Sequence, residues 1–143
     1  MLLEVADGVA KRLYETFGDG YPIYRGTVSQ GLKPPCFLLL MGEVSRRNMP
    51  MGRVFQQVPM QVQYFPGKQE GYAVVSAVAD SLYEALETIP VDDGWIRGVY
   101  KKSKITDGIL RFDVCYQGML QKKVELDKMQ VLTVETGTTE RER

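Results

Sequence analysis

Residues 13–40 read LYETFGDGYPIYRGTVSQGLKPPCFLLL, and this stretch decides the fold. Gly18 and Gly20 stand where a helix would end in a left-handed cap or a tight turn. A short extended piece follows, and then a double proline that favours extended backbone. The unbroken apolar run 36–41 is typical of a strand covered on both faces. The stretch therefore predicts a helix, a turn and two strands in succession.

Two helices are predicted on either side of this region. Apolar residues recur every three or four positions over residues 2–17, which predicts an amphipathic helix. The same spacing over 69–89, with Pro66-Gly67 before it and Pro90 after it, predicts a second.

The predicted strands surround these helices. They cover residues 23–28, 36–45, 54–65, 95–105 and 109–124. Pro59 cannot donate a ladder hydrogen bond, so we expect an edge position or a bulge there. Asp107-Gly108 between two extended runs predicts a hairpin. The order α-β-β-β-α-β-β predicts an α+β fold, in which two helices pack on one side of a mainly antiparallel sheet.

The chain divides at residue 124. Residues 1–124 are predicted to form a single α+β domain, and 125–143 an extended C-terminal tail. Within this tail, residues 129–134 are suited to an extra strand. Residues 136–143 contain no apolar side chain, so we expect them to be loose in an isolated subunit.

Bulk composition excludes several classes of protein. The 143 residues carry a formal net charge of zero, which argues against a dedicated nucleic-acid binder. No apolar run approaches the ~20 residues that span a bilayer, and the N-terminus does not resemble a secretion signal. The two cysteines, Cys36 and Cys115, are expected to be buried free thiols.

Catalytic chemistry has little support in the sequence. The chain has no histidine, which removes the commonest general base and metal ligand. Ser-Lys chemistry stays open, but no motif surrounds the candidate residues Ser45, Ser76, Ser81 and Ser103. Asp19 and the Asp92-Asp93 pair are typical of turns. We therefore predict no catalytic, cofactor-binding or metal-binding residue.

Basic and glutamine-rich segments are the candidate interaction sites. Arg46, Arg47 and Arg53 crowd one predicted loop together with Met49 and Met51. Arg and Met are both enriched at protein interfaces, although a solvated basic loop is the simpler interpretation. Two other groups of polar residues are open to the same two interpretations, an interface or a solvated surface. The first is Lys101, Lys102 and Lys104 on one predicted strand. The second is Gln56, Gln57, Gln61 and Gln63 on another.

Several local patterns occur together in a fixed order. They are KRLYETFGDGYPIY, QGLKPPCFLLL, a strand ending in QYFP, a helix with SLYEALETI, and a hairpin with Arg97-Gly98 followed by DGILRFDVCY. In this order the chain resembles the tail terminator family of tailed bacteriophages and prophages over residues 2–124. None of the patterns is a catalytic signature.

The resemblance implies a structural virion protein. Such subunits assemble as a six-fold ring that caps the head-proximal end of the tail tube and stops its growth. The implied partners are other copies of the chain, the tail tube protein, the head-tail connector and, in a contractile tail, the sheath protein. DNA passes through the ring without sequence readout, no membrane is involved, and assembly takes place in the host cytoplasm. Another head-tail adaptor, or a small hydrolase without a recognisable motif, are the alternatives.

The predicted interface has two parts. The first is the Arg and Met loop at residues 46–53, which we expect to become ordered on contact with a neighbour. The second is the C-terminal tail, where Val131, Leu132 and Val134 are suited to adding a strand to a neighbour's sheet.

Overall fold

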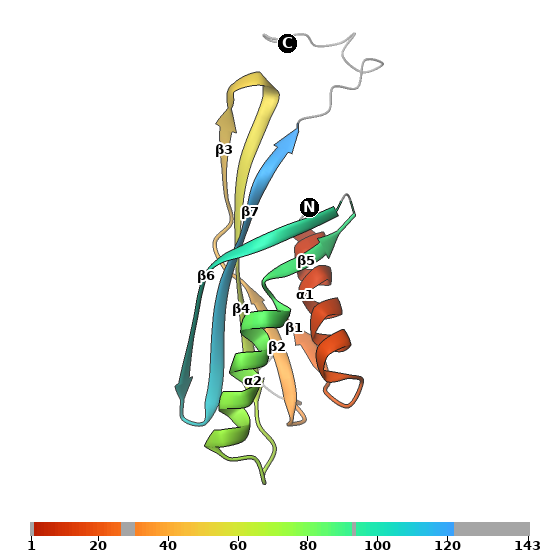
Figure 1. Ribbon diagram of the computed structural model, residues 1–143, viewed down its shortest axis with the longest axis vertical. Helices are drawn as coiled ribbons and strands as arrows, with labels where there is room; N and C mark the ends of the chain where they lie inside the picture. The colour runs from red at the N-terminus through yellow and green to blue at the C-terminus, as the bar shows by residue number, and fades with distance from the viewer. Residues whose placement is uncertain (1, 27–30, 93, 122–143) are drawn as a thin grey trace.

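The computed structural model describes residues 2–26, 31–92 and 94–121 of the chain. They form one curled sheet of seven strands and two helices, which confirms the predicted α+β class (Figure 1). In chain order the elements are α1 (Leu2–Phe17), β1 (Ile23–Arg25), β2 (Cys36–Met41), β3 (Ser45–Met49), the 3-10 turn η1 (Pro50–Gly52), β4 (Arg53–Phe65), α2 (Tyr72–Ala85), β5 (Thr88–Val91), β6 (Gly94–Thr106) and β7 (Ile109–Gln121).

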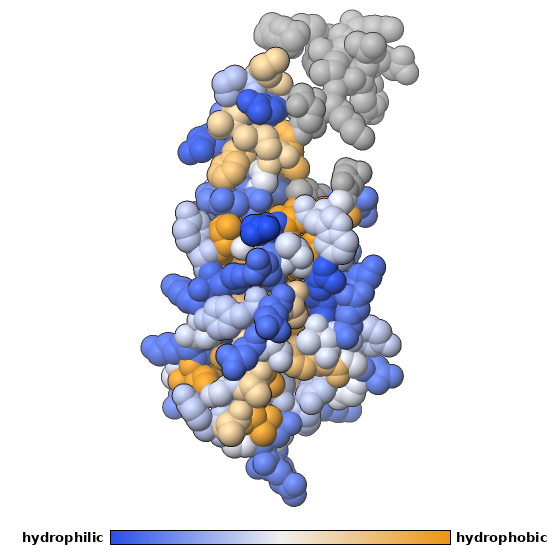
Figure 2. All heavy atoms as spheres, in the orientation of Figure 1, coloured by the Kyte–Doolittle hydropathy of each residue, from blue (hydrophilic) through white to orange (hydrophobic). Residues whose placement is uncertain are grey.

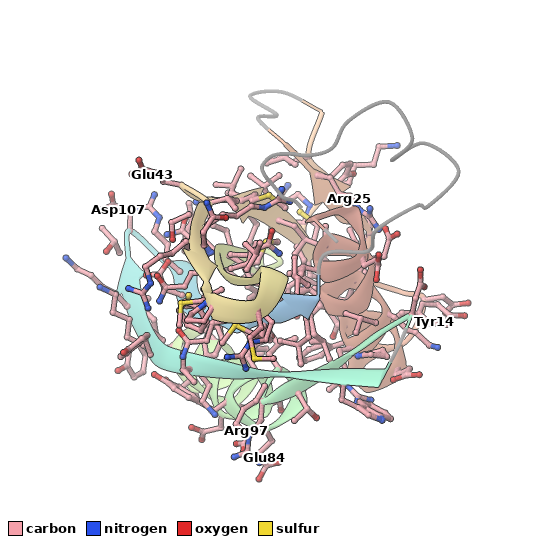
Figure 3. The ribbon with its side chains drawn as sticks, turned by 90° about the horizontal axis from the view of Figure 1, so that it is seen from above. Tyr14, Arg25, Glu43, Glu84, Arg97 and Asp107 are labelled. Carbon is pink, nitrogen blue, oxygen red and sulfur yellow. The ribbon has the colours of Figure 1, made fainter. Side chains whose placement is uncertain are left out.

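The sheet has the strand order β1-β2-β4-β7-β6-β5, and β3 also pairs with β4. β1 is parallel to β2, and every other pairing is antiparallel, so the predicted mainly antiparallel sheet is confirmed. Seen from above in Figure 3, the sheet curls from Arg25 on β1, past Asp107 at the β6–β7 turn, to Arg97 on β6. An ion pair of 2.7 Å between Arg25 and Asp7 ties the β1 edge to α1.

The core lies between the helices and one face of the sheet. α1 contributes Val5, Val9 and Leu13, all at most 1% exposed, so its predicted apolar stripe is confirmed. From the other elements, the same cluster contains Phe37, Leu39, Val58, Met60, Val62, Tyr64, Val75, Val78, Ala79, Leu82, Leu86, Ile89, Leu110, Phe112, Val114 and Tyr116. We call this side of the sheet the helix-side face and the opposite side the outer face.

The second helix ends earlier than its sequence pattern predicts. α2 stops at Ala85, and residues 88–91 form β5, which pairs with the start of β6. The prediction was wrong because the apolar Ile89 continues the spacing of the helical stripe, although the structure buries it from an extended segment. Pro90 lies within a strand instead of ending a helix, and it is tolerated because β5 is at the edge of the sheet.

The predicted loop over residues 46–53 is a β-hairpin. Ser45–Met49 pair with Gln57–Arg53, and η1 makes the turn with Met51 at φ 67° and Gly52 at φ 72°. β3 and β5 are thus two strands beyond the predicted order. The sequence SRRNM lacks a buried alternating face, so β3 depends on its backbone pairing with β4.

Pro59 lies in an internal strand, not at an edge. β2 pairs with Met60–Phe65 of β4 and β3 pairs with Arg53–Gln57, so Pro59 marks the point where one neighbour replaces the other. The register changes by one residue at this break. The irregular pairing that was predicted as an alternative is therefore confirmed, while the edge position is wrong.

The β6–β7 hairpin confirms its prediction. Asp107 and Gly108 have φ angles of 54° and 78°, as a two-residue type I′ turn requires. β6 pairs with β5 over its first residues and with β7 from Gly98 onward. The irregularity between Val99 and Lys102 holds Tyr100 at φ 55°. Predicted strand residues 27–28 and 122–124, and the tail 125–143, lie outside the described residues.

Candidate functional site

The described residues bring together no catalytic group. They hold no cluster of three or more metal-binding side chains. The backbone N–H of Asp92 lies 3.3 Å from a Glu4 carboxylate oxygen, and Asp19 is exposed, whereas Asp93 is outside the described residues. The hydroxyl of Ser103 is 3.0 Å from that of Tyr83, and no described serine hydroxyl is hydrogen bonded to a lysine.

The most distinctive surface is the end of the sheet that projects beyond the helices (Figure 1). It consists of β3, η1, residues 53–57 of β4 and residues 117–121 of β7, and we call it the blade. β6 pairs with β7 only as far as Tyr116, so within the described part of the chain the blade has three strands and two unpaired edges. Figure 2 shows hydrophobic side chains among charged ones at this end of the molecule.

All five described residues of the predicted interface lie on the blade. Arg46 donates its Nε–H to Gln56 Oε1, Arg53 donates its Nε–H to the Pro50 carbonyl at 3.2 Å, and the Arg47 guanidinium lies 5.4 Å from the Phe55 ring centre. In the described structure none of these arginines forms an ion pair, so their terminal amino groups can bind acidic partners.

Methionines provide apolar contact area on the same blade. Met51 at the tip is 85% exposed, and Met119 on β7 is 45% exposed. Met49 is half-buried beside them. Flexible methionines next to arginines are a composition that protein interfaces favour. The remaining predicted interface residues, Val131, Leu132 and Val134, lie outside the described residues.

The two faces of the blade differ. Strand alternation places Arg47, Phe55 and Met119 in one row on the outer face. Arg46 and Gln56 lie on the helix-side face, where Gln56 is only 2% exposed. Grouping Gln56 with the other glutamines on one polar face was therefore wrong.

The other three glutamines do form a polar ladder across the outer face. Gln57 bonds to Gln117 at 2.9 Å and to Ser45 at 3.2 Å. Gln61 bonds to Asp113 at 2.9 Å and to Gln63 at 2.7 Å. The bonds of Gln57 to Ser45 and Gln117 and of Gln61 to Asp113 cross between strands and support the register of β3, β4 and β7 on the side away from the core, whereas the Gln61–Gln63 bond lies within β4.

A shallow hollow of about 450 Å³ lies on the outer face below the blade. Its walls include Met41, Pro59, Tyr100 and Cys115. Burial raises the pKa of the Cys115 thiol, and also that of Cys36, which disfavours the reactive thiolate. Both cysteines are free, as predicted; Cys36 is also buried, whereas Cys115 is only partly buried, so the predicted burial of Cys115 was wrong.

The three lysines of β6 are separated in space. Lys101 forms an ion pair of 3.0 Å with Glu87 and, mainly through this hydrogen bond, lowers the pKa of the Glu87 carboxyl. Lys102 and Lys104 are exposed and form no ion pair in the described structure. Strand alternation explains this separation, because Lys102 and Lys104 are two residues apart and share one face, whereas Lys101 points to the other.

Fold and surface together define a small α+β domain with a projecting sheet end, and its described residues assemble no reaction site. The sequence profile of a family described as phage tail terminator protein matches residues 4–128. The chain therefore belongs to the phage tail terminator family, a family of structural proteins of the phage tail. No curated protein matches the chain in sequence.

Proposed function

We propose that the chain forms a six-fold ring on the head-proximal end of the phage tail tube, ends tube growth there and offers the joining surface for the head. Membership of the tail terminator family carries this proposal. The blade supports it, because it combines two unpaired edges with arginine and methionine side chains that suit contact with neighbouring subunits.

The proposed partners are other copies of the chain, the tail tube protein, the head-tail connector and, where the tail contracts, the sheath protein. DNA passes through the ring without sequence readout. Neither described helix is both long and apolar enough to cross a membrane.

Residues 1–124 act in this proposal as the ring-forming domain. Residues 125–143 act as an arm that docks on a neighbour, with Val131, Leu132 and Val134 as its apolar contacts. The last described residue of β7, Gln121, lies opposite Arg53 at the start of β4, near the tip of the blade.

Deletion of the coding sequence from the phage that carries it tests the function. We expect tail tubes of uncontrolled length and unjoined heads, and addition of the purified chain to tubes of normal length should restore joining. Tubes of normal length that fail only to join heads would identify a different head-tail adaptor. Normal, joined particles would refute both roles. Electron microscopy of the tube ends provides the measurement.

A further inference from the structure

The hydrogen-bond pattern shows which backbone groups face outward on the β7 edge of the blade. The Gly42 N–H donates to the Pro59 carbonyl at 2.8 Å, so the peptide groups of Pro59 face β2 and β3. Pro59 lies opposite Cys115, which makes this a non-hydrogen-bonded pair of the β4–β7 ladder. By alternation, Gln117 and Met119 direct their N–H and C=O groups away from β4. β6 has left β7 at this level, so in the described structure these groups have no strand partner.

The same alternation shows which backbone groups face outward on the opposite edge of the blade, which is formed by β3. Phe55 and Gln57 of β4 direct their peptide groups toward β3, where they meet Arg47 and Ser45. Arg46 and Asn48 therefore direct their N–H and C=O groups outward. Residues 45–48 of this strand are exposed. The blade thus carries one unpaired edge on each side.

We propose that β7 of one copy pairs in parallel with β3 of the next copy, so that the blades form a continuous sheet around the ring. The proposal rests on the ring function above and adds the surfaces that meet. β3 and β7 both run antiparallel to β4, so they run in the same direction within one copy. A rotation that carries one copy onto the next, about an axis along the strands, leaves the strand direction unchanged. The β7 edge of one copy and the β3 edge of the next therefore meet as parallel strands.

Side chains on the two edges are compatible with this pairing. Residues 117–121 of β7 carry no charge, so the arginines of β3 meet no like charge across the junction. Met119 of one copy lies at the level of Arg47 of the next, since both lie opposite Phe55 within a copy. Closure of a barrel adds a stagger between neighbours, which moves this contact along the strand in steps of two residues.

Closing the sheet into a barrel also leaves a central channel through the ring. Six copies of a three-stranded blade contain about 18 strands, and barrels of that size enclose an aqueous channel instead of a filled core. A continuous sheet further removes both open edges, which otherwise invite aggregation. Neighbouring copies of the chain are therefore the partners that pair the backbone groups of both blade edges.

Proline substitutions at the edges test the pairing. Met119→Pro and Asn48→Pro remove outward N–H groups and leave the bonds to β4 in place. Their matched controls, Leu120→Pro and Arg47→Pro, remove N–H groups that face β4. We expect the edge variants to lower the thermal midpoint of the monomer by less than about 2 °C. Each should weaken every junction about tenfold, so that native mass spectrometry no longer detects the hexamer. Both controls should lower the midpoint by clearly more.

A cross-link provides the second readout. Because the stagger moves the contact in steps of two residues, Met119→Cys is combined in turn with Ser45→Cys, Arg47→Cys or Met49→Cys, each together with Cys115→Ser. One of these three pairs should give on oxidation a disulfide ladder that ends at the hexamer. The single cysteine variants should give none.

Three outcomes would overturn the proposal. Intact hexamers in both edge variants would reject the paired edges and leave the ring standing. A Met119→Pro monomer as unstable as the Leu120→Pro monomer would show that another part of the same chain already occupies the β7 edge. Wild-type protein that stays monomeric up to about 1 mM, a concentration at which interfaces of about 4 kcal/mol or stronger associate, would reject the self-assembled ring and the paired edges together.

Discussion

Replacement of Gly8 by alanine tests how closely α1 packs on the sheet. A Cβ atom at this position would lie 2.5 Å from the Pro90 carbonyl oxygen and 3.2 Å from Ile89 Cβ. The first distance is about 1 Å below ordinary contact, and its partner is backbone, which cannot rotate away. The helix would have to move off β5, although Val5 and Val9 are fully buried on the same side.

Two opposing effects decide whether Gly8→Ala raises or lowers the free energy of unfolding. An alanine in a helix interior is worth about 1 kcal/mol over glycine. Overpacking of a filled core costs about 1–3 kcal/mol, and a clash with backbone belongs at the upper end. We therefore expect Gly8→Ala to lower the free energy of unfolding by about 1–2 kcal/mol.

Urea unfolding followed by circular dichroism measures this change. Ala77→Gly, at an exposed position within α2, is the control because it reports helix propensity without a packing term. It should lower the free energy of unfolding by about 1 kcal/mol. A Gly8→Ala protein more stable than wild type would show that α1 does not pack against β5 as described.

Three further changes test other parts of the molecule. Tyr64→Phe removes the buried hydrogen bond to Glu70, which also accepts the Gly67 N–H, and should cost about 1–2 kcal/mol in urea unfolding. Arg46→Glu combined with Arg47→Glu should leave the subunit folded, with a lower thermal midpoint because the buried Gln56 loses its Arg46 donor, and should block tail completion in a phage complementation assay. Truncation after residue 124 should change monomer stability by less than about 0.5 kcal/mol, as expected if the removed segment is the proposed docking arm, and should weaken assembly measured by native mass spectrometry.

Each change has an outcome that contradicts its reasoning. Unchanged stability of Tyr64→Phe would mean that Glu70 does not hold the β4–α2 connection. Normal phage yield from the double glutamate variant would remove the blade arginines from assembly. Unfolding on truncation would make the tail an internal strand instead of a docking arm.

Local sequence signals were sufficient for part of the fold. The spacing of Val5, Val9 and Leu13 predicted α1, and Asp107-Gly108 predicted the last hairpin. In both cases the signal and the structure it specifies lie within a few residues of each other. Such elements need no information from distant parts of the chain.

The two unpredicted strands depend on distant partners. Ile89 is an apolar residue at a position that continues the helical spacing, so periodicity could not distinguish a helix from the buried strand that the structure shows. Only pairing with β6 selects the extended form. β3 gave no signal at all, because a polar edge strand is specified by its backbone neighbour.

The candidate interface was predicted by composition but not by geometry. Arginines and methionines in one short segment indicated a contact surface. That Arg46 and Arg47 point to opposite faces follows only from the hairpin register. The burial of Gln56 likewise became visible only once Arg46 was placed beside it on the helix-side face.

The pairing of β4 with β7 determines when the sheet of each subunit can be completed during synthesis. The β4 segment ends at residue 65, yet the strand that covers its second edge is complete only at residue 121. At about 5–20 residues per second, a ribosome needs roughly 3–11 s to make the residues between them. During that interval the centre of the sheet is half-built, and the β7 edge does not yet exist. A nascent chain therefore cannot present both blade edges until synthesis of the domain is nearly finished.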